Sequence, residues 1–229
     1  MTDYSSSDWE LCFQSIHEIL GRYPNSMEQT QLQQFAQHLL TWNQSFNLIG
    51  PSAISTLLNR HILDSITLTP YLKTPAKIAD IGSGAGFPAL ILAILSNPSQ
   101  QYHLYESSQK KSRFLNFIVE ELQLNNRVTI HPKRAEEHSS HSNTFDIVTS
   151  RALGSLQLIA KLSKHLLHPN GICLALKGRN VQEEINQFLN APIAQFFNFP
   201  TLYNTPEKIG DGVIIQMQRV SRETNSAIQ

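Results

Sequence analysis

A short loop with one acid and three glycines contains the residues most able to do chemistry. The sequence Asp-Ile-Gly-Ser-Gly-Ala-Gly-Phe-Pro occupies 80–88, after a short apolar strand and before a run of apolar helix formers. A strand that leads through glycines into a helix N-terminus is the way an α/β sheet holds a nucleotide-like cofactor. We therefore take Asp80, Gly82, Gly84 and Gly86 as candidate cofactor-binding residues.

The glycine spacing separates one class of cofactor from another. The dinucleotide motif needs a third small residue so that the helix can pack on the strand, and Phe87 stands at that position. No Lys-Ser/Thr pair follows, so the loop is not a phosphate-binding P-loop. S-adenosylmethionine carries no phosphate. It needs a close backbone approach to its methionine part and carboxylates for its ammonium and ribose hydroxyls, which Asp80 and the glycines can provide. A glycine-rich turn without a ligand is the alternative.

A second acid strengthens the cofactor interpretation. Residues 102–105 have the pattern of the next strand, and Glu106 follows them about 20 residues after Gly86. An acid at this position of a nucleotide-binding sheet accepts hydrogen bonds from ribose hydroxyls. The alternative is an ordinary start of a helix, because two serines and three cations come next.

Two further strand ends supply candidates on the edge of the sheet where ligands bind in such folds. The third predicted strand leads to Ala135 and Glu136, which could cover an adenine and accept from its amino group. A solvated, charged loop is the alternative there. The fifth predicted strand leads into Lys177 and Arg179, which we expect to bind substrate.

An arginine follows the fourth predicted strand, beside the expected mouth of the cofactor site. Arg151 could bind a substrate phosphate or base, or it could pair with an acid on the cofactor side. A structural ion pair with Glu106 or Glu136 is the alternative interpretation.

The residue types that are missing from the strand ends exclude several kinds of methyl-transfer reaction. Methylation of an exocyclic amine usually uses Asp/Asn-Pro-Pro-aromatic after the fourth strand, whereas 149–152 here read Thr-Ser-Arg-Ala. No cysteine stands at a strand end to attack cytosine C5, and no general base with a histidine partner is evident. A target that is already nucleophilic, such as guanine N7, needs mainly proximity and alignment. Carboxylate or carbonyl dipoles would help the cation that develops on the base.

Composition places the chain in one broad class. Its 229 residues are 41% apolar, which suits one α/β domain with a large core. Eighteen basic and eighteen acidic residues cancel, so no global signature of nucleic-acid binding is present. Cys12 and Cys173 make no metal-ligand pattern, and we expect no metal; Cys173 has the pattern of a small buried apolar residue. We find no signal peptide or membrane-spanning run and expect a cytoplasmic protein.

The elements that position these residues form two parts. Helical periodicity over 8–20, 28–42 and about 52–69, with Ser26 as the N-cap of the second helix, predicts a helical extension at 1–75 that packs on the core. Strands then alternate with helices, which indicates a doubly wound, mainly parallel sheet. Strands are expected at 77–81, 102–105, 127–131, 145–149 and 171–177, and helices at 88–95, 109–123, 154–167 and 180–189.

The C-terminal part departs from this alternation. Two extended segments at 195–204 and 212–220 would join the sheet as an antiparallel hairpin. The domain would therefore span 76–220, and 221–229 would be a flexible tail. A mainly parallel sheet with an antiparallel C-terminal hairpin is the architecture of class I, Rossmann-like methyltransferases that use S-adenosylmethionine.

Seven short motifs between about 42 and 180 resemble the ribosomal RNA small subunit methyltransferase G family, also called glucose-inhibited division protein B. Among them, Arg-His-x-x-Asp-Ser at 60–65 is much more specific than the glycine loop itself. The motifs are Asn47-Leu48-Ile49-Gly50, Arg60-His61-Ile62-Leu63-Asp64-Ser65, the loop at 80–88, Lys111-Ser112-Arg113-Phe114-Leu115, Arg134-Ala135-Glu136-Glu137, Ser150-Arg151-Ala152 and Ala175-Leu176-Lys177-Gly178.

The resemblance implies methylation at N7 of one guanine in small-subunit (16S) rRNA, with S-adenosylmethionine as the methyl donor. It implies cofactor contacts or pocket positions for Gly82, Phe87, Ala135, Glu136 and Arg151. Many relatives have Asp where this chain has Glu106, and Ala135 replaces a larger apolar residue. The C-terminal 50 residues resemble the family only weakly.

The resemblance also implies residues on the substrate side. Arg60 and His61 would lie over the cofactor mouth and act there with Arg151, and Asn47 would contribute to substrate binding. The alternative for Arg60 and Asp64, four residues apart on a helix, is a surface ion pair.

We therefore predict a 16S rRNA guanine-N7 methyltransferase that acts as a monomer and has small-subunit rRNA or the 30S particle as its partner. The neutral net charge favours a pre-shaped ribonucleoprotein over naked RNA, because phosphate neutralisation can supply less affinity. One alternative is a methyltransferase of the same fold with a small molecule or protein as its substrate. Another is a cofactor-binding RNA module without catalytic activity.

Overall fold

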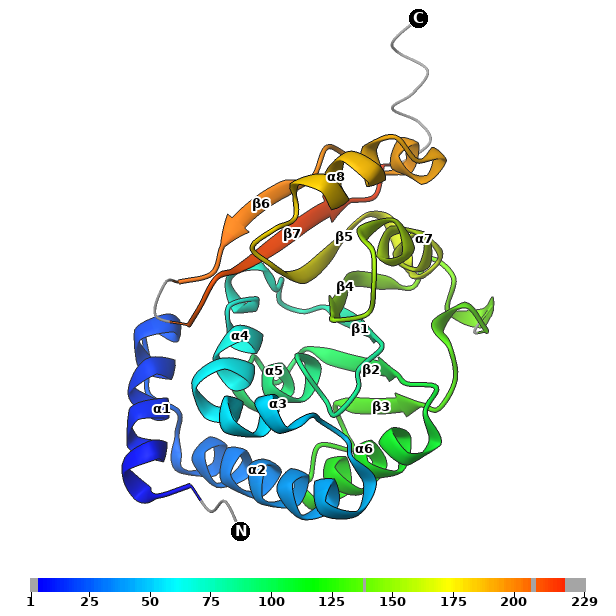
Figure 1. The fold of residues 1–229 in the computed structure, drawn as a ribbon. Helices are drawn as coiled ribbons and strands as arrows, with labels where there is room; N and C mark the ends of the chain where they lie inside the picture. The colour runs from blue at the N-terminus through cyan, green and yellow to red at the C-terminus, as the bar shows by residue number, and fades with distance from the viewer. Residues whose placement is uncertain (1–3, 138, 207–208, 221–229) are drawn as a thin grey trace, which may run out of the picture.

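Strands from across the second part of the chain assemble into one seven-stranded sheet (Figure 1). The structure, a computed structural model, describes residues 4–137, 139–206 and 209–220. The strand order is β3-β2-β1-β4-β5-β7-β6, with β7 antiparallel to both of its neighbours and the other pairs parallel. The strands are β1 (Lys77–Ile81), β2 (Gln101–Tyr105), β3 (Val128–His131), β4 (Phe145–Arg151), β5 (Leu167–Gly178), β6 (Thr201–Asn204) and β7 (Gly212–Gln218). The predicted mixed sheet is confirmed.

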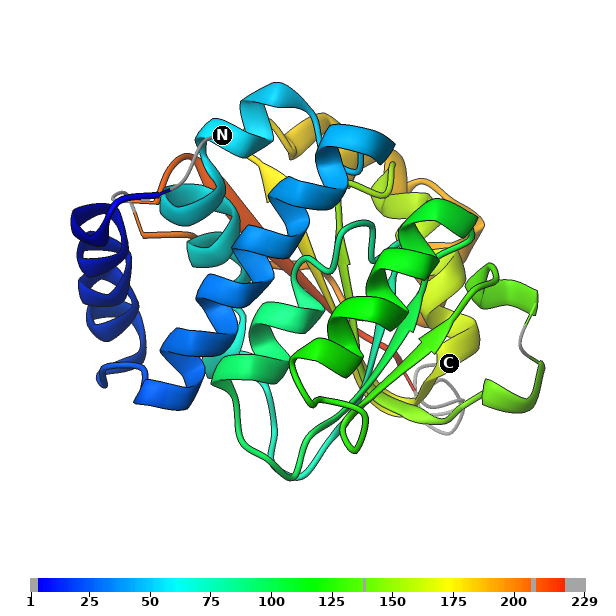
Figure 2. The same ribbon diagram turned by 90° about the horizontal axis from the view of Figure 1, so that it is seen from below.

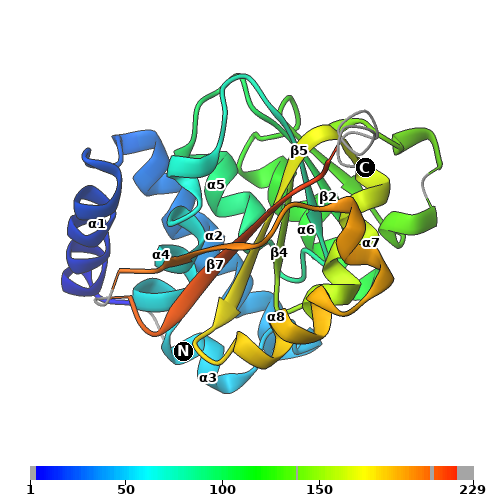
Figure 3. The same ribbon diagram turned by 90° about the horizontal axis from the view of Figure 1, so that it is seen from above.

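Helices cover both faces of the sheet, so its central strands are buried on two sides and are mostly apolar. Seen from below, α2, α5 and α6 lie in a row across one face (Figure 2). From above, α7 and α8 lie on the side of the molecule opposite α1, beyond β6 and β7 (Figure 3). The helices are α1 (Ser6–Leu20), α2 (Ser26–Phe46), α3 (Pro51–Ser55), α4 (Leu63–Ile66), α5 (Ala89–Leu95), α6 (Gln109–Glu121), α7 (Leu156–Leu166) and α8 (Gln182–Leu189).

The N-terminal helices share a hydrophobic core with the adjoining face of the sheet. Phe35 of α2 packs edge-on against Phe87, with ring centroids 5.3 Å apart, and also contacts Phe114 of α6. Phe87 is thus a buried anchor between the glycine loop and α2. On the other face, Cys173 is buried as predicted, and Ser163 Oγ donates to its Sγ at 3.2 Å.

The single helix predicted over 52–69 is wrong. The segment is divided into α3, a π-helical turn at Leu57–Ile62, α4 and a short 3-10 turn at Thr69–Tyr71. In the π turn the amides of Arg60 and His61 both donate to Thr56 O, at 2.9 and 3.2 Å. A π turn inserts one extra residue into a helix, and apolar residues both within this turn and in α4 are buried. Arg60 and His61 both lie in this π turn.

Helix ends differ from the predictions in smaller ways. Asn25, not Ser26, is the N-cap of α2: its side chain accepts from Glu28 N at 3.0 Å, and Glu28 accepts in return from Asn25 N. The helix continues beyond 42 to Phe46.

The first strand of the C-terminal hairpin is shorter than the expected segment at 195–204. A 3-10 turn occupies Pro192–Phe196, and within 195–204 only Thr201–Asn204 forms a strand. The predicted tail at 221–229 lies outside the described residues. Within the described part of the chain, no helix is both long and apolar enough to cross a membrane.

Candidate active site

The glycine loop keeps its amides for the protein itself. Gly82 N and Ser83 N donate to the carbonyl of Tyr105 at 2.9 and 3.1 Å, and Gly84 N donates to Glu106 Oε2 at 2.9 Å. Gly86 N donates to Ser83 O at 2.8 Å. A diphosphate needs several free amides at such a place. The loop is therefore suited to a ligand without a phosphate group.

The three glycines are required for different reasons. All have positive φ, at 71°, 58° and 102°. A Cβ on Gly82 would lie 2.5 Å from Leu153 Cδ1, and one on Gly86 would lie 2.5 Å from Leu90 Cδ1. A Cβ on Gly84 would meet nothing closer than 3.9 Å. A side chain at Gly86 would press on most of the Leu90 side chain, and one at Gly82 would force the end of the Leu153 side chain to shift, whereas Gly84 leaves open space at the loop.

Asp80 is fully enclosed beneath this loop. Its Oδ1 accepts from Thr149 Oγ1 at 2.8 Å, a bond set by the β1–β4 register in which these two residues are paired. Its Oδ2 is buried and has no hydrogen-bond partner in the described structure. Burial, which disfavours the charged form, raises the pKa of Asp80 to about 7. A cation that reached Oδ2, such as the ammonium of S-adenosylmethionine, would supply the missing partner.

A cavity of about 380 Å³ opens at the carboxyl ends of β1, β2 and β3. It brings together Gly82, Glu106, Ala135 and Glu136, which the sequence analysis named. Asp80, Gly84, Gly86, Phe87 and Arg151 do not line it. The lining residues are Ile81, Gly82, Tyr105, Glu106, Ser107, Lys111, Lys133, Arg134, Ala135, Glu136, Ala152, Leu153, Leu158 and Leu162. We call this the cofactor cavity.

Glu106 is held in place by the backbone at one side of this cavity. Its Oε1 accepts from Ser108 N at 2.7 Å and its Oε2 from Gly84 N at 2.9 Å. Each carboxylate oxygen can accept more than one hydrogen bond. The carboxylate is thus oriented by the loop and retains capacity to accept from hydroxyl groups.

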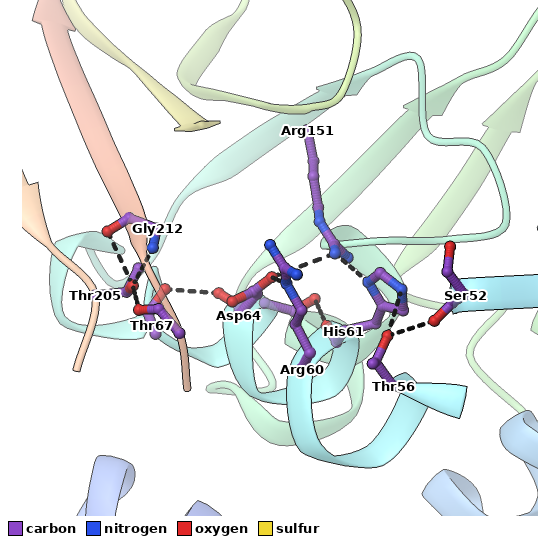
Figure 4. Close-up of polar contacts among 11 residues, drawn as sticks. Ser52, Thr56, Arg60, His61, Asp64, Thr67, Arg151, Thr205 and Gly212 are labelled. Atoms are coloured by element: carbon purple, nitrogen blue, oxygen red, sulfur yellow. Dashed lines mark hydrogen bonds and ion pairs between the residues drawn. The ribbon is translucent and has the colours of Figure 1, made fainter. Parts of the chain in front are cut away.

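Arg151 at the end of β4 forms the centre of a second cluster (Figure 4). Its Nη2 donates to His61 Nδ1 and lies 3.3 Å from Asp64 Oδ2. Its Cζ lies 5.7 Å from the ring centre of Phe87. The alternative of an ion pair with Glu106 or Glu136 is wrong, because the acid that binds Arg151 is Asp64.

These contacts determine the protonation of His61. A guanidinium only donates, so His61 Nδ1 must accept, and the proton is on Nε2, 3.5 Å from Thr56 Oγ1. Burial, together with the positive charges of Arg151 and Arg60, lowers the pKa of His61 to about 4. The imidazole is therefore neutral near pH 7 and orients the arginine.

Asp64 is shared by two arginines. Arg60 Nε lies 3.9 Å from Asp64 Oδ2, four residues along the chain, and its side chain is 56% exposed. Burial raises the pKa of Asp64, while Arg151 and Arg60 act in the opposite direction. Asp64 was not among the predicted site residues, although it stands in the specific motif at 60–65.

A second cavity, of about 250 Å³, lies against this cluster. Ala152, with a positive φ of 55°, lines both cavities, so the two adjoin at the end of β4. The lining residues are Arg60, Asp64, Arg151, Ala152, Leu176, Lys177, Gly178, Thr205, Gly210, Asp211 and Gly212. We call this the target cavity. Its Thr205 and Asp211 come from the C-terminal hairpin, where the sequence carried no functional signal.

The remaining predicted substrate residues are engaged or remote. Lys177, 11% exposed, donates through Nζ to Gly154 O and to Glu184 Oε1, the latter at 2.6 Å. Arg179, 69% exposed, pairs with Asp211. Asn47 ends α2 with φ 48° and lines neither cavity. The chain also has a larger cavity of about 670 Å³ between α1 and α2, but none of the candidate residues lines it.

The strand order, the antiparallel β7 and the glycine loop after β1 define a class I methyltransferase fold. Solved methyltransferases share this fold. The CurJ carbon methyltransferase aligns with a TM-score of 0.57 at 15% identity, covering 91% of this chain and 70% of the other. A proposed S-adenosylmethionine-dependent methyltransferase from Methanococcus maripaludis aligns with a TM-score of 0.58 at 16% identity, covering 82% and 93%.

Sequence comparison identifies the family within this class. The family model described as rRNA small subunit methyltransferase G matches residues 28–202. Proteins of that name from Halorhodospira halophila and Coxiella burnetii are 39% and 35% identical, over 70% and 82% of this chain and 75% and 90% of their own lengths. The one from Caulobacter vibrioides is 35% identical over 83% of this chain and 85% of its own length. The chain belongs to the rRNA small subunit methyltransferase G family.

Proposed function

We propose that this chain transfers a methyl group from S-adenosylmethionine to N7 of one guanine in small-subunit rRNA. The observation that carries the proposal is the meeting of two cavities at Ala152. One is bordered by the glycine loop, and the other by the family-specific Arg60 and Asp64 with Arg151. A methyl donor in the first and a base in the second would be neighbours.

The residues around the cofactor cavity fit S-adenosylmethionine, whose sulfonium carries a methyl group open to nucleophilic attack. Glu106, which is oriented by Gly84 N and Ser108 N, would accept from the ribose hydroxyls. Ala135 and Glu136 border the same cavity and would cover the adenine. The unpartnered Oδ2 of Asp80 would stabilise the ammonium group. Family membership supports the same cofactor.

The second cluster suits a target that needs no deprotonation. Guanine N7 has a free lone pair, so the protein needs to align it and exclude water rather than remove a proton. His61 is neutral and already engaged with Arg151, which leaves it without the role of a general base. The Nε and Nη1 donors of Arg151 make no hydrogen bond in the described structure, and they could donate to guanine O6 or to a phosphate.

Methyl transfer from labelled S-adenosylmethionine to 30S particles that lack the modification tests the proposal. We expect one methyl group per particle, at a single guanine. Methylation at N7 allows the base to be removed, so the position can be mapped by cleaving the rRNA at the resulting abasic site. Transfer to free 16S rRNA, measured in parallel, shows whether the assembled particle is preferred. Transfer only to small molecules or proteins would overturn the rRNA assignment. Binding of the particle with no transfer would identify a non-catalytic RNA-binding module.

A further inference from the structure

Five cations lie on the two segments that border one side of the cofactor cavity, the start of α6 and the turn after β3. Lys110, Lys111 and Arg113 belong to the first turns of α6, and Lys133 and Arg134 follow β3. The last residues of β2 and β3 are paired in parallel register, so both segments leave the sheet at the same edge. We call these five residues the rim cations. Lys111, Lys133 and Arg134 line the cofactor cavity, while Lys110 and Arg113 lie outside its lining and are exposed.

The rim cations differ from the cations around the target cavity in their partners. Every cation of the target cavity or its border is paired with an acid. The pairs are Arg60 and Arg151 with Asp64, Lys177 with Glu184, and Arg179 with Asp211. Within the described ranges, no rim cation forms an ion pair with a carboxylate. The chain is neutral as a whole, so this concentration of unpaired positive charge is local.

Helix electrostatics make this arrangement unfavourable without a bound anion. The first turn of α6 carries no acidic residue, and its cations face the positive end of the helix dipole. The carboxylates nearby, Glu106, Glu136 and Glu137, number three against the five cations, and Glu106 is already held by two backbone amides. S-adenosylmethionine has one carboxylate and no phosphate, so it cannot neutralise them either. A polyanion would.

An aromatic surface adjoins the same end of α6. Lys110 Nζ donates to the carbonyl of Phe46 at 2.8 Å, so the rim cations continue onto the end of α2. Phe46 is 44% exposed as a residue, and its ring centroid lies 5.3 Å from that of Trp42. Cations that follow a phosphate backbone beside an exposed aromatic ring are the combination that binds single-stranded nucleic acid.

We infer that the rim cations bind the phosphate backbone of the RNA strand that flanks the target nucleotide, with the Phe46 ring available to a neighbouring base. The inference rests on the proposed function and adds a substrate surface to it. Paired arginines at the target cavity would orient one nucleotide, and unpaired cations beside the cofactor cavity would supply affinity for the strand.

The full-length double variant Lys110→Gln with Arg113→Gln tests the inference, because neither side chain lines the cofactor cavity. Binding to a single-stranded uridine oligonucleotide is measured over a salt series, and methyl transfer to 30S particles is measured as kcat and KM. Each lost phosphate contact on a single strand reduces the log-log salt slope by about 0.7, so two reduce it by about 1.4. We also expect KM for the particle to rise about tenfold, with kcat and S-adenosylmethionine affinity unchanged.

The matched control is Lys73→Gln with Lys161→Gln. These residues are exposed, one before the amino end of β1 and one on α7, and their loss changes net charge equally. The control should keep the wild-type salt slope and KM. An unchanged slope and KM in the Lys110/Arg113 variant, or equal losses in the control, would overturn the inference.

Two further measurements distinguish loss of RNA contacts from unfolding of the variant and from failure of the proposed function. Removing positive charge from the start of α6 should leave the melting temperature unchanged or raise it slightly, so weaker binding cannot come from unfolding. If wild-type protein transfers no methyl group to 30S particles, the proposed function fails. The oligonucleotide salt slope still tests the rim cations by themselves in that case.

Discussion

The cofactor cavity and the target cavity adjoin at Ala152 but are assembled from the chain in different ways. The cofactor cavity comes mainly from consecutive units of the sheet: the loop after β1, Glu106 after β2, and the turn after β3. The target cavity joins segments from the N-terminal helices, the end of β4 and the C-terminal hairpin. The first depends on backbone hydrogen bonds within one supersecondary unit. The second depends on packing between parts of the chain that are far apart.

The two cavities also differ in how their charges are balanced. The cofactor side contains a buried acid, Asp80, with an unpartnered oxygen. On the target side, Asp64 is shared by Arg60 and Arg151, and its charge is already compensated. The cofactor side therefore keeps a buried carboxylate oxygen without a partner among the described residues, whereas the target side presents arginines already held in position.

The largest expected effect concerns Asp80. With an unfolded pKa near 3.8 and a folded pKa of about 7, Asp80 takes up a proton on folding between these values, so its contribution to stability falls as pH rises. Compared with Asp80→Asn, the wild-type free energy of unfolding should fall by about 1.4 kcal/mol for each pH unit from 4 to 7. Chemical denaturation of both proteins across this pH range measures the difference.

Saturating S-adenosylmethionine sharpens the same experiment. If its ammonium group stabilises ionised Asp80, the pH-dependent difference should shrink, and Asp80→Asn should bind the cofactor more weakly. A difference that does not vary with pH would show that Asp80 is ionised in the folded protein. An unchanged slope with cofactor present would place the ammonium elsewhere.

Arg151→Ala should have the next largest effect, and it acts on the target side. Loss of the oriented guanidinium should lower kcat/KM for 30S particles about 100-fold, equivalent to ~2.7 kcal/mol. Affinity for S-adenosylmethionine, measured by calorimetry, should change little because Arg151 does not line the cofactor cavity. Unchanged turnover would remove Arg151 from the site. An equal loss of cofactor affinity would assign it to both cavities.

Two glycine variants distinguish the effect of side-chain contact from the effect of backbone conformation in the cofactor loop. Gly82→Ala creates a contact of 2.5 Å with Leu153, and we expect it to cost about 2 kcal/mol in the free energy of unfolding. Gly84→Ala meets open space and should cost only about 1 kcal/mol for its left-handed φ. Thermal and chemical unfolding measure both. Equal losses would show that backbone conformation alone requires these glycines.

The smallest effect tests whether Lys177 contacts substrate or positions the loop after β4. Its Nζ and Leu156 N both donate to Glu184, which connects that loop to α8. If Lys177 acts by positioning, Lys177→Met and Glu184→Gln should each lower kcat/KM about fivefold, or ~1 kcal/mol, and the double variant should add little. A loss in Lys177→Met without one in Glu184→Gln would indicate direct substrate contact.

The sequence by itself determined the order of elements and the cofactor loop. Apolar periodicity, turn residues and the Asp-x-Gly-x-Gly-x-Gly pattern act over a few neighbouring residues, so they could be read without the fold. The five parallel strands, the antiparallel hairpin and the cavity shared by Gly82, Glu106, Ala135 and Glu136 followed from these local signals. These signals did not give the end of α2 at Phe46, where Asn47 adopts a left-handed conformation, or the π turn that interrupts 52–69.

Only the tertiary structure decided which charges pair. Arg151 binds Asp64, 87 residues away in the chain, rather than Glu106 or Glu136. Arg151 also donates to His61, whose Nδ1 is therefore an acceptor, and burial together with the charges of Arg151 and Arg60 lowers the pKa of His61. Lys177 is engaged by Glu184 instead of pointing free at a strand end. The sequence shows which side chains are charged. Which of them form ion pairs depends on distances of a few ångströms, and packing between remote segments sets those distances.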